Sequence, residues 1–167
     1  MRIKCGGRHI KPAVIACLVV IVDQITKAVV VNGLALYSSV PVINGFFNLT
    51  HIHNPGGAFG FMANQGEAIR VFFFLVVACA AMVFVLYFYY KTPEKHFFFR
   101  VCLSLIFGGA IGNLIDRIRL GKVIDFLDFY IGQWHWPAFN IADSAITIGI
   151  AIYIFHILFN KIPEFDK

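Results

Sequence analysis

Four long runs of apolar residues, separated by polar segments, dominate the pattern along the chain. They cover residues 13–31, 71–90, 97–115 and 141–159. Each run is close to the roughly 20 residues that a helix needs to cross the hydrocarbon core of a bilayer. The pattern therefore predicts a mainly α-helical, polytopic membrane protein with four transmembrane helices, folded as a single integral membrane domain over residues 1–167.

The segments between these runs differ in length and content. A short turn joins the second and third runs, whereas the connections 32–70 and 116–140 are longer and hold most of the unusual polar residues. Residues 46–53 lie between turn signals that begin at Asn44 and Asn54, and their partly alternating pattern favours strands. We expect a small β-sheet on the outer surface of the bilayer.

The distribution of basic residues predicts how the spans are oriented. Nine of the fourteen Lys and Arg residues lie before the first run, around the short turn, or after the fourth run. Basic residues are retained on the cytoplasmic side. We therefore expect both termini in the cytoplasm and the connections 32–70 and 116–140 in the periplasm. The net charge of +5, in a chain with 59% hydrophobic residues, is then a topology signal and gives no support for nucleic-acid binding.

The cysteines show no disulfide pattern, because none of them lies in the two long outer connections. They are Cys5, Cys17, Cys79 and Cys102. Residues 14–17 look like a lipoprotein processing box, but the apolar run continues to residue 31. We therefore predict that the first span is not cleaved and that Cys17 is packed in the core.

Five aspartates lie near the outer ends of the spans or in the second outer connection, namely Asp23, Asp116, Asp125, Asp128 and Asp143. A charge inside a membrane costs roughly 2.5–3.5 kcal/mol on insertion scales, so each one needs a reason. Asp23 lies four residues before Lys27, and Asp116 is followed by two arginines. We predict that these two carboxylates are paired and structural.

Asp125 and Asp143 have no such neighbouring cation. Asp143 is the third residue after Asn140, a natural helix cap, and a helix N-terminus favours an ionised carboxylate. It can therefore be a purely structural acid of the first turn. The apolar neighbours of Asp125 raise its carboxyl pKa by desolvation. One ionised and one protonated aspartate is the arrangement that an aspartic peptidase uses.

Asp128 is the residue most easily confused with a catalytic one. If residues 123–130 are extended, Asp125 and Asp128 point to opposite faces, and only Asp125 is a candidate. If the segment is helical, both acids share a face, and the choice between them stays open.

Other classes of site find less support. The chain has no His-Glu-x-x-His and no Gly-x-Ser-x-Gly motif. His51 and His53 lack a third metal ligand nearby, so we expect them to form hydrogen bonds. Two non-peptidase functions stay open: a small ion-coupled transporter with an aspartate relay, and an assembly factor with structural ion pairs only.

Five motifs, in order along the chain, resemble those of lipoprotein signal peptidase (signal peptidase II), a family of bacterial membrane aspartic peptidases. They are Asp-Gln-Ile-Thr-Lys at 23–27, Asn-Pro-Gly-Gly-Ala-Phe at 54–59, the glycine-rich run at 108–117, and the segments 121–126 and 139–144. Gly57 stands where the family pattern has Ala. Together the motifs extend from the first span to the last.

The resemblance implies an aspartic endopeptidase that removes the signal peptide of prolipoproteins just before a cysteine bearing a diacylglyceryl group. Asp125 and Asp143 are then the catalytic pair. Further polar residues shape the site and bind the substrate backbone, namely Asn54, Asn113, Arg117 and Asn140. Asp23 and Lys27 hold the outer loop against the first span, and Asp116 is structural.

The same resemblance implies a four-helix bundle with a small periplasmic sheet and a short interfacial helix, in the bacterial inner membrane. The implied partners are lipid-modified prolipoproteins and membrane lipids, with no nucleic acid. We expect no metal and no organic cofactor, and a chain that acts as a monomer with its active site at the periplasmic face.

Overall fold

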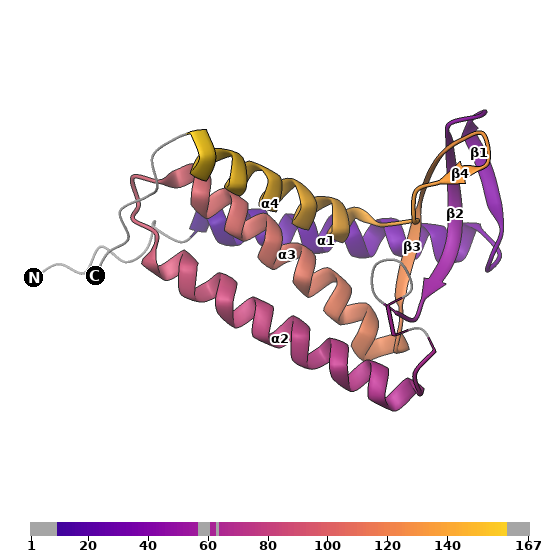
Figure 1. Cartoon of the computed structure of the whole chain (residues 1–167), viewed down its shortest axis with the longest axis horizontal. Coiled ribbons are helices and arrows are strands. Elements are labelled where there is room, and N and C mark those ends of the chain that lie inside the picture. Colours follow the sequence, from indigo (N-terminus) through magenta and orange to yellow (C-terminus); the bar gives the residue numbers. More distant parts are fainter. Residues whose placement is uncertain (1–9, 57–60, 63, 160–167) are drawn as a thin grey trace, which may run out of the picture.

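The computed structural model describes residues 10–56, 61–62 and 64–159, and it consists of four long helices with a small sheet at one end (Figure 1). The helices are α1 (Ile10–Gly33), α2 (Glu67–Lys91), α3 (Phe97–Leu120) and α4 (Ile141–Phe159). All four are long and apolar enough to cross a membrane. The predicted mainly helical membrane fold is thus confirmed.

Helix α3 lies at the centre of the bundle and packs against the other three helices. Its glycines permit the close approach. A Cβ at Gly108 would lie 2.7 Å from the carbonyl oxygen of Ala16 on α1, and one at Gly109 would overlap the carbonyl of Ala142 on α4. The glycine-rich run at 108–112 therefore serves helix packing, as small residues do between helices in lipid.

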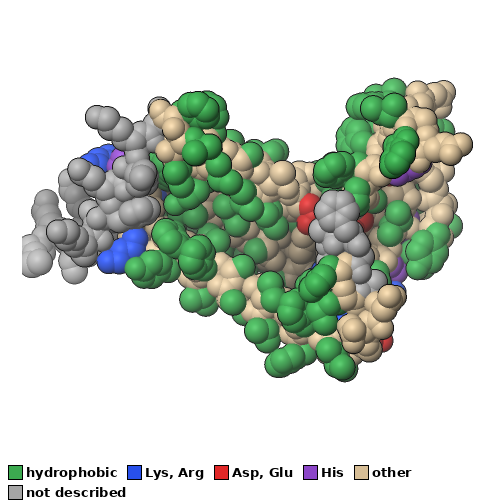
Figure 2. Space-filling model, in the orientation of Figure 1, with side chains coloured by type: hydrophobic (Ala, Val, Ile, Leu, Met, Phe, Trp, Pro, Cys, Tyr) green, Lys and Arg blue, Asp and Glu red, His purple; other side chains and the backbone are tan. Residues whose placement is uncertain are grey.

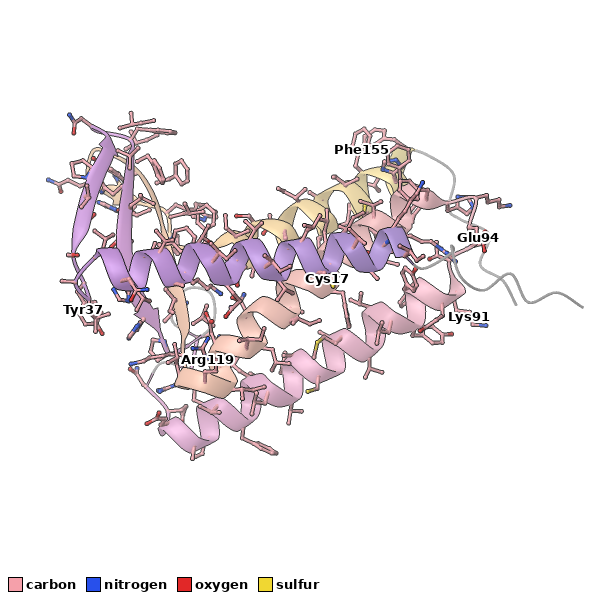
Figure 3. The ribbon with its side chains drawn as sticks, turned by 180° about the vertical axis from the view of Figure 1, so that it is seen from behind. Cys17, Tyr37, Lys91, Glu94, Arg119 and Phe155 are labelled. Carbon is pink, nitrogen blue, oxygen red and sulfur yellow. The ribbon has the colours of Figure 1, made fainter. Side chains whose placement is uncertain are left out.

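The outward surfaces of the helices are apolar. Large side chains such as Val29, Phe72 and Val83 are each about two-thirds exposed, which suits contact with lipid tails and not with water. Cys17 also lies on the surface of α1 (Figure 3). The prediction that Cys17 is packed in the core is therefore wrong, because that side of the first half of α1 is not covered by another helix.

Helix α3 ends at Leu120, further along the chain than the predicted end at residue 115. The extension includes Asp116, whose charge is paired with Lys27 inside the bundle, so this polar residue does not interrupt the helix. Gly121 then stops α3 in the left-handed conformation, with φ of 69°, and its N–H donates to the carbonyl of Arg117.

One end of the molecule carries the α2–α3 turn and the other end carries the sheet (Figure 1). Helix α1 begins and helix α4 ends beside the α2–α3 turn, whereas the sheet lies at the opposite end of the bundle (Figure 1). Viewed from behind, Lys91 and Glu94 mark the turn end and Tyr37 marks the sheet end (Figure 3).

The sheet is antiparallel, in the order β1-β2-β3-β4. Its strands are β1 (Ser39–Ile43), β2 (Phe47–Asn54), β3 (Val123–Ile131) and β4 (Trp134–His135). The strand prediction for residues 46–53 is confirmed, and residues 123–130 are extended. The short interfacial helix is absent from the described residues. Residues 57–60 and 63, with the variant position Gly57, lie outside them.

A bulge in the middle of β2 decides which side chains meet on the two faces of the sheet. Asn48 and Asn54 are an even number of residues apart, so in a regular strand they would share a face. The register with β3 shifts between them, and the extra residue reverses the alternation. Asn48 therefore meets Asp128 on one face, and Asn54 meets Asp125 on the other.

Candidate active site

A cavity of about 880 Å³ lies between the sheet and helices α3 and α4. Asp125 and Asp143 both line it, together with Asn54, Asn113 and Arg117. Acidic side chains are visible in the hollow between the helix bundle and the sheet (Figure 2). The structure thus brings together residues from four of the five motifs, with the motif of the first span lying behind them.

A second cavity, of about 500 Å³, lies between α1, α2 and α3 toward the turn end of the bundle. Its lining is almost wholly apolar and includes Ala16, Cys17 and Tyr90, with no carboxylate. Since hydrolysis needs polar groups, this cavity is not a candidate for the chemistry.

Asp125 lies in β3 and is only 2% exposed. Its Oδ2 accepts a hydrogen bond of 3.0 Å from the Asn54 amide, and its Oδ1 accepts one of 2.7 Å from the Asn140 amide. Burial, followed by the charge of Asp143, raises the pKa of Asp125 from 3.8 to about 7, against the opposing effect of the two amides. Asp125 therefore exchanges its proton near neutral pH.

Asp143 lies in the first turn of α4, where the predicted cap is confirmed. The Asn140 side-chain oxygen accepts a hydrogen bond of 2.9 Å from the Asp143 backbone N–H. In return, Asp143 Oδ2 accepts one of 3.3 Å from the Asn140 backbone N–H, which completes a capping box. Asp143 Oδ1 accepts a further bond of 2.7 Å from the Asn113 amide. A helix N-terminus with these donors favours the ionised carboxylate.

Asn140 connects the two carboxylates directly. Its side chain is completely buried, and the two ends of its amide serve different aspartates. The NH₂ group donates to Asp125, while the oxygen caps the helix at Asp143. The two acids are therefore fixed relative to each other by one side chain that is not free to rotate.

Behind the cavity lies a buried cluster of charges from α1 and α3. Lys27 Nζ is 2.9 Å from Asp23 Oδ2 and 2.8 Å from Asp116 Oδ2, and all three side chains are at most 3% exposed. The predicted Asp23–Lys27 pair is confirmed. The expectation that Asp116 pairs with the arginines after it in sequence is wrong, since Lys27 on the neighbouring helix takes that place.

Arg117 points away from Asp116 and lines the cavity instead. Its Nη2 donates a hydrogen bond of 2.8 Å to the carbonyl oxygen of Gly56, and its guanidinium carbon lies 4.0 Å from the centre of the Phe74 ring. Adjacent residues on a helix face different directions, which explains why the two neighbours separate. Arg117 places a positive charge at the wall of the site.

Asp128 occupies the opposite face of β3 from Asp125, as the extended alternative predicts. Its carboxylate binds the Asn48 amide at 3.0 Å and His135 Nδ1 at 2.8 Å. These contacts hold neighbouring strands together and lie outside the cavity lining. Asp128 is therefore a structural residue.

The two histidines of β2 form hydrogen bonds, as predicted. His51 Nδ1 lies 2.9 Å from the carbonyl oxygen of Leu34, and its Nε2 lies 3.3 Å from Nε2 of His53. Burial, followed by nearby positive charges, lowers the pKa of His53. Within the described part of the chain, no three His, Cys, Asp or Glu side chains are grouped to hold a metal ion.

Sequence reasoning overlooked Gln24. Its amide donates to Asp23 Oδ2, the oxygen that also binds Lys27, and to Asp116 Oδ1, each at 3.1 Å, and so forms a second link between the two carboxylates. The sequence signal for Gln24 was its place in the motif at 23–27, within an apolar run. A glutamine at such a position needs buried hydrogen-bond partners.

Comparison with known proteins agrees with this geometry. Residues 15–159 match the family model described as Signal peptidase (SPase) II. The lipoprotein signal peptidase of Desulforapulum autotrophicum is 50% identical over 155 residues, which cover 93% of this chain and 96% of the relative. That of Syntrophus aciditrophicus is 49% identical over 139 residues, covering 83% and 86%.

Solved structures show the same fold. A bacterial membrane enzyme determined by the in meso method at 2.3 Å resolution superposes with a TM-score of 0.81 and 36% identity, over 94% of each chain. A second such structure, at 1.9 Å resolution, gives a TM-score of 0.80 at the same identity. With the family model covering residues 15–159, this chain belongs to the signal peptidase II family of aspartic peptidases.

Proposed function

We propose that the chain cleaves the signal peptide from prolipoproteins just before a cysteine that bears a diacylglyceryl group, with Asp125 and Asp143 as the catalytic pair. The observation that carries the proposal is that both carboxylates line one cavity and are joined through Asn140. The lipoprotein signal peptidases to which the chain is similar give the substrate class.

The two environments suit different roles in peptide hydrolysis. Asp143, at a helix N-terminus, acts as the base and takes a proton from the attacking water. Asp125, whose pKa is raised to about 7, supplies a proton to the peptide carbonyl oxygen as the tetrahedral intermediate forms. The proton held by Asp143 then passes to the leaving amine as the C–N bond breaks, and Asp125 is reprotonated from the intermediate's hydroxyl.

The cavity suits a substrate that is partly peptide and partly lipid. Its polar rim carries Asn54 and Arg117, which can bind backbone carbonyls, while Ile146 and Ile148 extend it along α4 toward membrane depth. A signal peptide crosses the membrane as a helix whose internal hydrogen bonds shield the scissile carbonyl. Binding at the sheet end of the bundle favours a locally unwound segment there.

The charge distribution supports a location in the bacterial inner membrane. Lys91, Lys95 and Arg100 lie at the turn end of the bundle, which the positive-inside rule assigns to the cytoplasm. Lys11 lies at the start of α1, beside the same turn, and the other five basic residues of this group lie outside the described residues. Both termini are then cytoplasmic, and the catalytic cavity, at the opposite end, faces the periplasm. The chain acts as a monomer and needs no cofactor.

An ion-coupled transporter is not favoured. A relay across the membrane would place carboxylates at several depths. In this chain Asp23, Asp116, Asp125 and Asp143 are all joined into one hydrogen-bonded network near the sheet end.

The test is cleavage of a purified diacylglyceryl-modified precursor peptide by the protein in detergent. Asp125→Asn and Asp143→Asn should each lower the cleavage rate by several orders of magnitude while the protein stays inserted and folded. A strong chelator should leave the parent rate unchanged. Near-parent turnover by either folded variant, or chelator inactivation that zinc reverses, would refute the aspartic mechanism.

A further inference from the structure

Lys27 lies at a position from which it can control both catalytic carboxylates, although it touches neither. Each of its three ammonium N–H groups has one acceptor: Asp23 Oδ2, Asp116 Oδ2 and Asn113 Oδ1, the last at 3.0 Å. The lysine is 2% exposed. Its charge and all of its donors are thus used inside the protein, with none left for substrate.

The first of these contacts leads to Asp143. Asp23, held by Lys27, accepts with its other oxygen a hydrogen bond of 2.9 Å from the backbone N–H of Ala142. Ala142 directly precedes Asp143 in the first turn of α4 and is itself completely buried. The position of the α4 N-terminus relative to α1 is therefore set by the carboxylate that Lys27 orients.

The second contact leads to Asp125 in the same manner. Asp116 accepts a hydrogen bond of 3.2 Å from the backbone N–H of Ile124, through the oxygen that also binds Lys27. Ile124 directly precedes Asp125 in β3. One lysine therefore orients two carboxylates, and each of these binds the residue immediately before a catalytic aspartate.

The third contact fixes the direction of an amide. Because Lys27 can only donate, the Asn113 side chain must turn its oxygen toward the ammonium. Its NH₂ group then faces the cavity and donates to Asp143 Oδ1 at 2.7 Å. The reversed amide would place an oxygen against the carboxylate and would be repelled.

Stability alone is a poor reason for such a cluster. Removing two carboxylates and an ammonium from solvent is costly, and apolar residues of similar volume are often as good or better for stability. Packing alone therefore does not require these charges. They are needed if α1, α3, α4 and β3 must be held at fixed distances from one another.

We propose that Lys27 is a positioning residue for catalysis, which sets the Asp125–Asp143 pair through Asp23, Asp116 and the orientation of the Asn113 amide. This inference rests on the proposed function. It predicts that loss of the lysine lowers turnover by misplacing both acids, and not by weakening the binding of substrate, because the cluster lies behind the cavity.

The experiment compares full-length variants in detergent with the diacylglyceryl-modified precursor peptide. In Lys27→Gln/Asp116→Asn one positive and one negative charge are removed together, so the net charge of the cluster is unchanged. We expect kcat to fall about 100-fold, the effect of an error of about 1 Å in catalytic geometry, while KM stays close to the parent value. Parent kcat in the folded double variant, or a rise in KM alone, would overturn the proposal.

A second pair of variants decides the matter if that double variant does not fold. Asp116→Asn keeps an oxygen for the Ile124 N–H, whereas Asp116→Ala does not. Positioning predicts a clearly higher kcat for Asp116→Asn among folded molecules, while a purely structural role predicts equal kcat and a difference in melting temperature only. Cleavage by the parent and its loss in Asp125→Asn test the proposed function separately. A failure of the positioning role of Lys27 can therefore be distinguished from a failure of the proposed function.

Discussion

Replacement of Asn140 by Ser and by Ala separates its two functions, the cap of α4 and the amide donor to Asp125. Serine is a good helix cap, so Asn140→Ser keeps the hydrogen bond to the N–H of Asp143 but loses the donor. Alanine loses both. Because a lost cap costs about 1 kcal/mol, Asn140→Ala should be less stable than Asn140→Ser by about that amount.

The effect on activity follows from the charge of Asp125. In the proposed mechanism Asp125 supplies a proton, so activity falls as the pH rises through its pKa, which is about 7. The Asn140 amide favours the ionised form and thus lowers this pKa. A hydrogen bond to a charged group contributes about 1.5–3 kcal/mol, so its removal should move the alkaline limb upward by about one to two pH units.

The assay is kcat/KM for the precursor peptide across the pH range, with the melting temperature measured on the same samples. Both variants should show the upward shift of the alkaline limb and a lower maximum rate, and only Asn140→Ala should melt clearly earlier. An unchanged alkaline limb in folded Asn140→Ser would refute the assignment of Asp125 as the acid. Full activity in Asn140→Ser would show that only the cap matters.

Two further predictions concern residues outside the proposed catalytic pair. Asp128→Asn should retain most of the cleavage rate, because its carboxylate binds Asn48 and His135 on the other face of β3; complete loss of cleavage in the folded variant would contradict this. Gly112→Ala should lower the free energy of unfolding by about 1–3 kcal/mol, and with it the melting temperature, and should lower activity. The reason is that its Cβ would lie 2.6 Å from Asp23 Oδ2. Gly33→Ala is the matched control: nothing lies within 4 Å of its Cβ, so its rate and melting temperature should not fall.

The sequence was sufficient for features that depend on local spacing. Apolar runs of membrane length predict the four helices, and the interval of four residues predicts the Asp23–Lys27 pair. Asn140 and Asp143 are recognisable as a cap and its third residue because the capping interaction is local as well.

Features that depend on contact between segments far apart in the sequence could not be predicted from local spacing. The partner of Asp116 is Lys27 because α1 packs closely against the glycines of α3, and no local rule predicts that contact. The bulge in β2 is not visible in the sequence, because it depends on how β2 pairs with β3, a strand about 70 residues away along the chain. The exposure of Cys17 depends on which sides of α1 the other helices leave open.

The order of the charged residues along the chain has a consequence for biosynthesis. When α1 enters the bilayer, α3 does not yet exist, but Lys27 and Asp23 lie one turn apart on α1 and can neutralise each other from the start. An unpaired charge would cost roughly 2.5–3.5 kcal/mol at this step. Asp116 arrives later, on α3, at a site where a cation is already in place. The translocon is therefore never required to insert an isolated lysine, and the second carboxylate joins only when the helices assemble.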